Sequence, residues 1–214
     1  MAKISEKGLI VSKVGMTRMV DANGNIVPVT LLKVENQKVT KVLTPERDGY
    51  HGYQVGYKVK AEKNLTKADI HRLRKVEVEE NYARFTEFRT SGVEGLEVGA
   101  AMTAELFQDV AAVDVTGITK GRGFQGAVKR WGASIGRMTH GSRFHRRPGS
   151  LGQCTTPGRV YKNKHQPGHM GVVSRTVKNV QVMDVDTAAN VIAIKGSVPG
   201  HREGMLEIRP TNKK

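Results

Sequence analysis

Both ends of the chain carry short apolar stretches that alternate with turn-forming residues. These stretches lie at residues 8–11, 16–20, 26–34, 38–43, 53–57, 85–88, 110–115, 180–185, 191–194 and 205–209. Runs of this length, separated by signals such as Asn23-Gly24, are typical of antiparallel strands joined by tight turns. They predict a mainly β fold built on a small closed or nearly closed β-barrel.

A helical signal interrupts the strands between residues 61 and 84, where charges of both signs are dense. Thr66 is followed three residues later by Asp69, a spacing that resembles a helix capping box. We therefore predict a short helix near Lys67–Lys75 within a small α-containing insert. The predicted organisation is a barrel core from residues 1–60, 85–116 and 176–212, the insert at 61–84, and a long extended loop at 117–175.

The loop lacks the periodicity of either a helix or a strand from Gly117 to Gly171. It holds 12 of the 24 glycines, and its apolar residues occur singly. Such a segment buries too little apolar surface to offset the entropy lost on ordering. We predict an extended arm that is not ordered when free and becomes ordered against a partner. A flexible insert with no defined bound shape is the alternative.

Charge indicates what that partner is. The formal net charge is +15, and from Val115 to Met183 the chain holds 13 of its 35 basic residues and none of its 20 acidic ones. The remainder carries 22 basic and 20 acidic residues. The absence of Asp and Glu over such a length favours a polyanion that packs against several sides of this segment. A nucleic acid meets that description. A basic surface without a specific partner is the alternative.

Three other patterns suggest different chemistry. Gly121–Gly126 reads G-x-G-x-x-G, but the acid that a dinucleotide site needs about twenty residues later is missing, since Asp184 is the next one. His165 and His169 have a metal-binding spacing for a helix, but a proline and a glycine separate them. Cys154 has no carboxylate nearby to complete a nucleophilic site. We predict no catalytic residue, no metal and no cofactor.

The same sequence predicts a compartment. One cysteine excludes an intrachain disulfide. The first residues contain no apolar run typical of a signal peptide, and no stretch approaches the roughly 18 apolar residues of a membrane span. We therefore expect a soluble cytoplasmic protein that binds neither a membrane nor a small-molecule substrate.

The basic segment also contains an ordered series of specific motifs. They are Val113–Gly117, Lys120–Gly126, Lys129–Trp131, Thr139–Ser142, Arg147–Gly152, Thr156–Val160, Lys162 and Pro167–Gly171, with Gly8–Ile10, Lys13–Arg18 and Val198–Gly200 outside it. This series resembles the family of protein three of the bacterial large ribosomal subunit, a universal ribosomal protein. The resemblance runs nearly end to end and is least distinctive from residue 61 to 110.

The resemblance implies a barrel of the translation-protein type, a small insert, and a loop that threads through rRNA towards the peptidyl transferase centre. It also implies a role early in subunit assembly, with other large-subunit proteins as neighbours. The innermost part of the loop would be Gly149, Ser150, Leu151, Gly152, Gln153, Cys154 and Thr155. Some members carry a methylated glutamine where this chain has Thr155, which puts that modification in doubt here.

We therefore predict a non-catalytic protein that binds large-subunit rRNA, the 23S rRNA, through its arm. Cations would neutralise phosphates, most densely from Arg137 to Arg147, and Trp131 would stack or wedge. The predicted contacts are Lys120, Arg122, Lys129, Arg130, Trp131, Arg137, His140, Arg143, His145, Arg146, Arg147, Arg159, Lys162, Lys164, His169 and Arg175. Two alternatives are a general RNA-binding or RNA-chaperone protein and an RNA-modifying enzyme with a basic substrate loop.

Overall fold

The computed structural model describes residues 7–21, 23–76, 80–92 and 95–211. The chain divides into two compact units. Unit 1 comprises residues up to Ile118 and from Ser174 onwards, and unit 2 comprises Thr119–Val173. No helix in the described part of the chain is long and apolar enough to cross a membrane.

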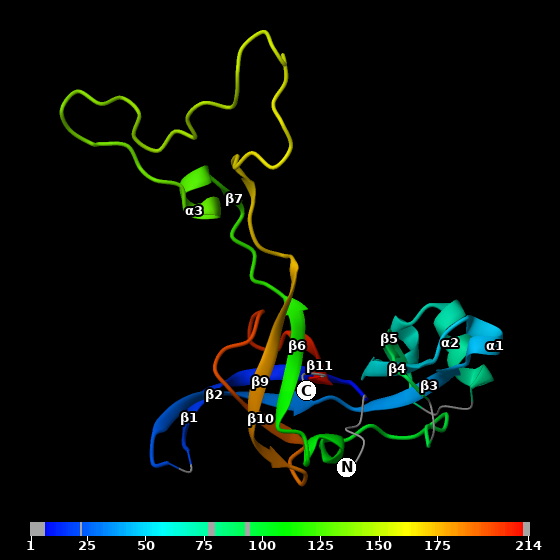
Figure 1. Cartoon of the computed structure of the whole chain (residues 1–214). Coiled ribbons are helices and arrows are strands. Elements are labelled where there is room, and N and C mark those ends of the chain that lie inside the picture. Colours follow the sequence, from blue (N-terminus) through cyan, green and yellow to red (C-terminus); the bar gives the residue numbers. More distant parts are fainter. Residues whose placement is uncertain (1–6, 22, 77–79, 93–94, 212–214) are drawn as a thin grey trace. The chain divides into compact units, whose positions relative to one another are not determined.

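Within the described residues of unit 1, six antiparallel strands close into a barrel in the order β1-β11-β6-β9-β10-β2 (Figure 1). The strands are β1 (Leu9–Val20), β2 (Ile26–Val34), β6 (Ala112–Ile118), β9 (Ser174–Asp186), β10 (Val191–Lys195) and β11 (Met205–Pro210). Alternate residues of β6, such as Val113 and Val115, are fully buried, as are Leu206 and Ile208 of β11. The predicted mainly β fold and its barrel are confirmed.

A separate three-stranded sheet holds β3 (Gln37–Leu43), β4 (Gly52–Val59) and β5 (Tyr82–Arg89) in that order. The sequence placed these strands in the barrel core, and that placement was wrong. Alternation shows which face of a strand is buried, but it does not show which strand lies beside it. The predicted ranges also included residues 1–6, 22, 77–79, 93–94 and 212, which lie outside the described residues.

Four short helices accompany these strands among the described residues of unit 1. They are α1 (Pro45–Asp48), η1 (Glu62–Asn64), α2 (Lys67–Lys75) and η2 (Ala104–Phe107). Helix α2 has the predicted bounds, and the hydroxyl of Thr66 accepts the backbone N–H of Asp69 at 3.3 Å. The predicted helix and its cap are therefore confirmed. Leu73 is the buried residue of α2.

Two buried side chains join the three-stranded sheet to the start of β1. The Tyr53 hydroxyl accepts the N–H of Gly8 at 2.6 Å and donates to the carbonyl of Gly8 at 2.9 Å. Gln37 accepts the N–H of Ile10 and donates to its carbonyl, each at 3.0 Å. Each side chain therefore binds both backbone groups of one buried residue, and the Ile10 carbonyl also accepts the N–H of Glu35 at 3.4 Å. Tyr53 also stacks on Phe88, with ring centroids 5.4 Å apart.

The ladder between β6 and β9 contains a bulge. Its register shifts between Val113 and Val115, and Asn179 adopts a φ of 55° in the left-handed region. The N–H of Asn179 donates to a carboxylate oxygen of Asp114 at 2.8 Å. A bulge inserts an extra residue into one strand, and the Asp114 side chain here accepts an N–H that the ladder does not pair.

Candidate nucleic-acid interface

Unit 2 begins as a ribbon of two chain segments. The N–H of Thr119 donates to the carbonyl of Val173 at 3.0 Å, and that of Arg122 donates to the carbonyl of Met170 at 2.8 Å. The ribbon continues into β7 (Phe124–Gln125) and β8 (Gly168–His169), which pair antiparallel. The G-x-G-x-x-G motif therefore lies in a strand pair and not at the start of a nucleotide-binding helix.

Gly171 allows the two segments of this ribbon to approach. Its φ is 84°, and a Cβ at this position would overlap the carbonyl of Lys120. Any side chain would therefore be strained by the backbone conformation and would also force the segments apart. The positive φ of Gly171 therefore allows a close backbone contact within the chain.

A short helix, α3 (Ala127–Trp131), follows the ribbon and ends at Gly132, whose φ is 69° (Figure 1). The indole N–H of Trp131 donates to the carbonyl of Gln166 at 2.9 Å, and the Arg130 guanidinium donates to the same oxygen at 3.0 Å. We call residues 124–132 with 165–169 the α3 node. The sequence predicted no helix here, because five residues are too few for a helical period to show.

Trp131 also makes a ring contact in the α3 node. Its ring stacks on that of His165, with centroids 4.5 Å apart and planes 10° from parallel. The Arg130 guanidinium lies over the Trp131 ring, 5.0 Å from its centroid. A Cβ on Gly168 would overlap that guanidinium. Two segments far apart in sequence thus form one compact group.

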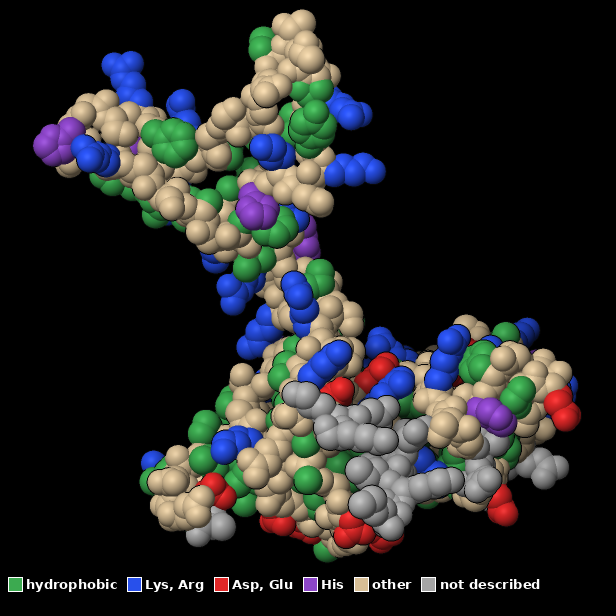
Figure 2. Space-filling model, in the orientation of Figure 1, with side chains coloured by type: hydrophobic (Ala, Val, Ile, Leu, Met, Phe, Trp, Pro, Cys, Tyr) green, Lys and Arg blue, Asp and Glu red, His purple; other side chains and the backbone are tan. Residues whose placement is uncertain are grey.

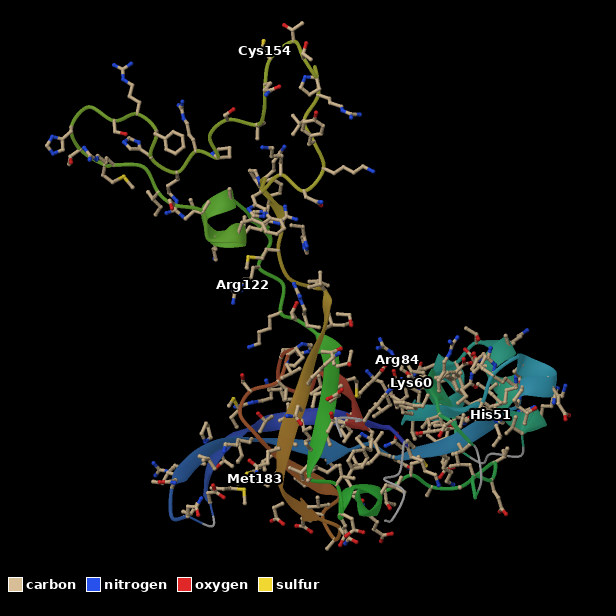
Figure 3. The ribbon with its side chains drawn as sticks, in the orientation of Figure 1. His51, Lys60, Arg84, Arg122, Cys154 and Met183 are labelled. Carbon is tan, nitrogen blue, oxygen red and sulfur yellow. The ribbon has the colours of Figure 1, made fainter. Side chains whose placement is uncertain are left out.

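Beyond α3 the chain forms two loops. In the first, the N–H of Gly136 donates to the carbonyl of His145 at 2.8 Å, and the Phe144 ring packs against Gly136 and Gly149. The second loop contains the predicted tip, where the Ser150 hydroxyl donates to the carbonyl of Gly152 at 3.2 Å. Figure 3 shows Cys154 at a bend of the second loop and Arg122 in the ribbon.

The electrostatics of unit 2 are one-sided. It contains no Asp or Glu, and Figure 2 shows basic and histidine side chains but no acidic ones on the visible face of this unit. Its cations therefore have no carboxylate within the unit to pair with. Three ion pairs found among the described residues, Lys38–Glu80, Lys41–Asp48 and Arg74–Glu62, all belong to unit 1. The unit presents an unneutralised positive surface.

Nearly every predicted contact residue is exposed. Arg130 is half-buried, with its guanidinium over the Trp131 ring. The predicted tip, residues 149–155, is exposed throughout, and Arg175 is exposed on β9 in unit 1. The exposed contacts in unit 2 are Lys120, Arg122, Lys129, Trp131, Arg137, His140, Arg143, His145, Arg146, Arg147, Arg159, Lys162, Lys164 and His169.

Among the predicted contact residues, Arg130 and Trp131 share a hydrogen-bond acceptor, and two further residues join them in the α3 node. His165 and Gln166 were absent from the predicted contact set, and both bind Trp131. No local pattern could have found them, because the contact spans 34 residues. Among the described residues, no three His, Cys, Asp or Glu side chains gather where they could hold a metal ion.

Comparison with known proteins decides the family. Residues 58–191 match the family model described as ribosomal protein L3. The chain belongs to the ribosomal protein L3 family. This is a family of structural ribosomal proteins, not of enzymes. The resemblance read from the sequence motifs is therefore confirmed.

Individual members of the ribosomal protein L3 family match almost end to end. The chain is 46% identical to large ribosomal subunit protein uL3 of Alkaliphilus metalliredigens over 97% of its length and 98% of that protein. It is 46% identical to the protein of the same name from Vibrio parahaemolyticus, over 96% and 99% of the two chains. The uL3 protein of Aliivibrio fischeri is 44% identical over the same shares.

Proposed function

We propose that this protein is a structural constituent of the large ribosomal subunit and that unit 2 binds 23S rRNA directly. The observation that carries the proposal is the carboxylate-free surface of unit 2, on which the basic side chains are exposed. Phosphates are the ligands that such a surface suits, because each neutralised phosphate releases a counterion and strengthens binding. Membership of the ribosomal protein L3 family supports the ribosome as the setting.

Shape and backbone contacts would dominate this binding. RNA helices offer side chains little sequence to read, so proteins recognise their phosphates, sugars and unstacked bases. Unit 2 supplies cations for the phosphates and exposed rings such as Phe124 and Tyr161 for stacking. Phe124 is 76% exposed, the most of any aromatic side chain among the exposed large hydrophobic residues.

The predicted tip, Gly149–Thr155, is the part that we place nearest the peptidyl transferase centre. The support is the motif resemblance, together with the exposure and small size of most tip side chains. Such a segment approaches RNA closely and offers no acid–base pair, so its role there would be to shape rRNA. We also infer that the protein joins the subunit early in assembly and has other large-subunit proteins as neighbours.

Sedimentation tests the ribosomal assignment. A lysate is fractionated on a sucrose gradient at moderate salt, and each fraction is probed for the chain. We expect the chain to be recovered with the large subunit. Recovery in light fractions alone would refute the proposal.

Salt dependence tests the role of unit 2. Replacing Arg143, Arg146 and Arg147 by Gln removes three exposed cations, so the slope of log affinity for 23S rRNA against log salt should fall by two to three. A matched variant changes the exposed Lys58, Lys63 and Lys67 of unit 1 to Gln, and its slope should change by less than about one. Equal effects would contradict the assignment of the interface to unit 2.

RNA specificity separates the leading proposal from the general RNA-binding alternative. A variant lacking Arg122–Lys164 should keep the far-ultraviolet circular dichroism of the barrel and bind 23S rRNA much more weakly. The complete chain should prefer 23S rRNA to an unrelated RNA of equal length. Equal binding of both RNAs would favour a general RNA chaperone.

A further inference from the structure

The ring stack in the α3 node is exposed. His165 covers one face of Trp131, yet His165 itself is exposed, and Trp131 remains 46% exposed. The stack therefore includes an exposed imidazole. An exposed flat ring is a surface on which another flat ring can stack.

This stack is held in place by the protein itself. The carbonyl of Gln166, the residue next to His165, accepts hydrogen bonds from both the Trp131 indole and the Arg130 guanidinium. Gly168 leaves the space that the guanidinium occupies. A ligand that stacks here therefore has little side-chain entropy to remove, which favours binding.

The surroundings of the stack identify the class of ligand. Lys164 directly precedes His165, and Lys129 lies on α3, and both side chains are exposed. Unit 2 has no carboxylate to recognise a basic peptide. A flat ring joined to phosphates fits both the imidazole and the cations, and a nucleotide of RNA has that composition.

We propose that His165, held against Trp131, is the platform on which one unpaired base of the large-subunit RNA stacks. The inference rests on the proposed function, because it assumes that unit 2 binds this RNA. The base must be unpaired, since a paired base is stacked on its neighbours within the helix and offers no free face. Sequence preference at this site would be weak, because every base has a face that can stack.

Substitution at His165 separates stacking from charge. Stacking of one base is worth about 1–3 kcal/mol, so His165→Ala should weaken binding of 23S rRNA by about 5- to 150-fold. The loss should be similar at all salt concentrations, because no phosphate contact is removed. His165→Tyr keeps a flat ring and should retain affinity within about threefold of the original chain. His165→Lys keeps a cation and should not.

The measurements use the full chain and 23S rRNA, with filter-binding isotherms from 50 to 200 mM KCl. His51→Ala, at an exposed histidine of unit 1, is the matched control and should bind as the original chain does. Ultraviolet irradiation of the complex, followed by mass spectrometry, should find a nucleotide attached to the peptide that contains His165 or Trp131. The crosslink reports on the unchanged protein, so it decides the question even if His165→Ala disrupts the node.

Two results would overturn the platform. The first would identify a phosphate contact at His165. In that case His165→Lys would bind 23S rRNA as tightly as the original chain and His165→Tyr would not, and His165→Ala would lower the salt slope by about one. The other is a crosslink found elsewhere in unit 2 but not at this peptide, with His165→Ala binding normally. If deletion of Arg122–Lys164 also leaves binding unchanged, the proposed function fails together with the platform.

Discussion

Tyr53 and Tyr82 offer a matched test of what a buried hydroxyl contributes to stability. Both side chains are fully buried, and Tyr→Phe makes the same chemical change in each. The Tyr53 hydroxyl binds both the N–H and the carbonyl of Gly8, which is itself buried. The Tyr82 hydroxyl has no hydrogen-bond partner among the described residues. The two substitutions should therefore have different effects.

The magnitudes follow from the partners that are lost. In Tyr53→Phe the N–H and the carbonyl of Gly8 both lose their partner in a buried place. Each unsatisfied group costs about 1–3 kcal/mol, so the free energy of unfolding should fall by about 2–5 kcal/mol. Tyr82→Phe removes a desolvated hydroxyl without breaking a hydrogen bond between described residues, so stability should stay the same or rise by up to about 1 kcal/mol.

Urea unfolding at pH 7, followed by far-ultraviolet circular dichroism, measures both variants. With a slope on the order of 2 kcal/mol per molar urea, Tyr53→Phe should lower the midpoint by about 1–2.5 M. The midpoint of Tyr82→Phe should not fall. Equal losses in the two variants would show that the hydrogen bonds of the Tyr53 hydroxyl do not account for its effect on stability.

Three further results are expected. Gln37→Leu should lower the free energy of unfolding by about 1–3 kcal/mol, because it leaves the buried N–H of Ile10 unpaired, while the Ile10 carbonyl keeps the N–H of Glu35. The exposed Gln181→Leu should change it by less than about 0.5 kcal/mol in the same urea assay. Burial raises the pKa of Tyr82 to about 12, so the folded chain keeps a proton that the unfolded chain loses above about pH 10. Stability should therefore fall between pH 10 and 12, and the fall should be shallower in Tyr82→Phe. Gly171→Ala should speed hydrogen exchange at the Arg122 amide, because it separates the two segments of the ribbon. Unchanged values in any of these measurements would count against the contact concerned.

The sequence predicted the positions of the strands well, because each strand buries alternate side chains. It failed to predict which strands lie side by side. Gln37 shows why, since it begins β3 and is buried as deeply as an apolar residue. Its amide satisfies the backbone of Ile10 in another element. No local pattern reveals such a long-range polar contact, so the separate sheet could not be predicted.

The sequence predicted the amino-acid composition of the candidate interface but not the contacts within it. Missing acids and frequent glycines can be counted along the chain, so the segment and its charge were evident. The stack of His165 on Trp131 depends on the ribbon that brings residues 165–169 beside residues 124–132. Helix α3 is only five residues long, and its end at Gly132 is its clearest local signal. Tertiary contacts therefore decide the structure of the node.

The bulge between β6 and β9 affects how the protein tolerates inserted and deleted residues. A slip of one residue between two strands would turn the buried side chains of the slipped strand outward. Asp114 resists such a slip, because its carboxylate accepts the N–H of Asn179 and that residue alone takes the left-handed conformation there. Residues inserted or deleted between Thr119 and Val173 would then lengthen or shorten unit 2 without moving the register of β9. The barrel can therefore keep its strand pairing while the length of unit 2 changes.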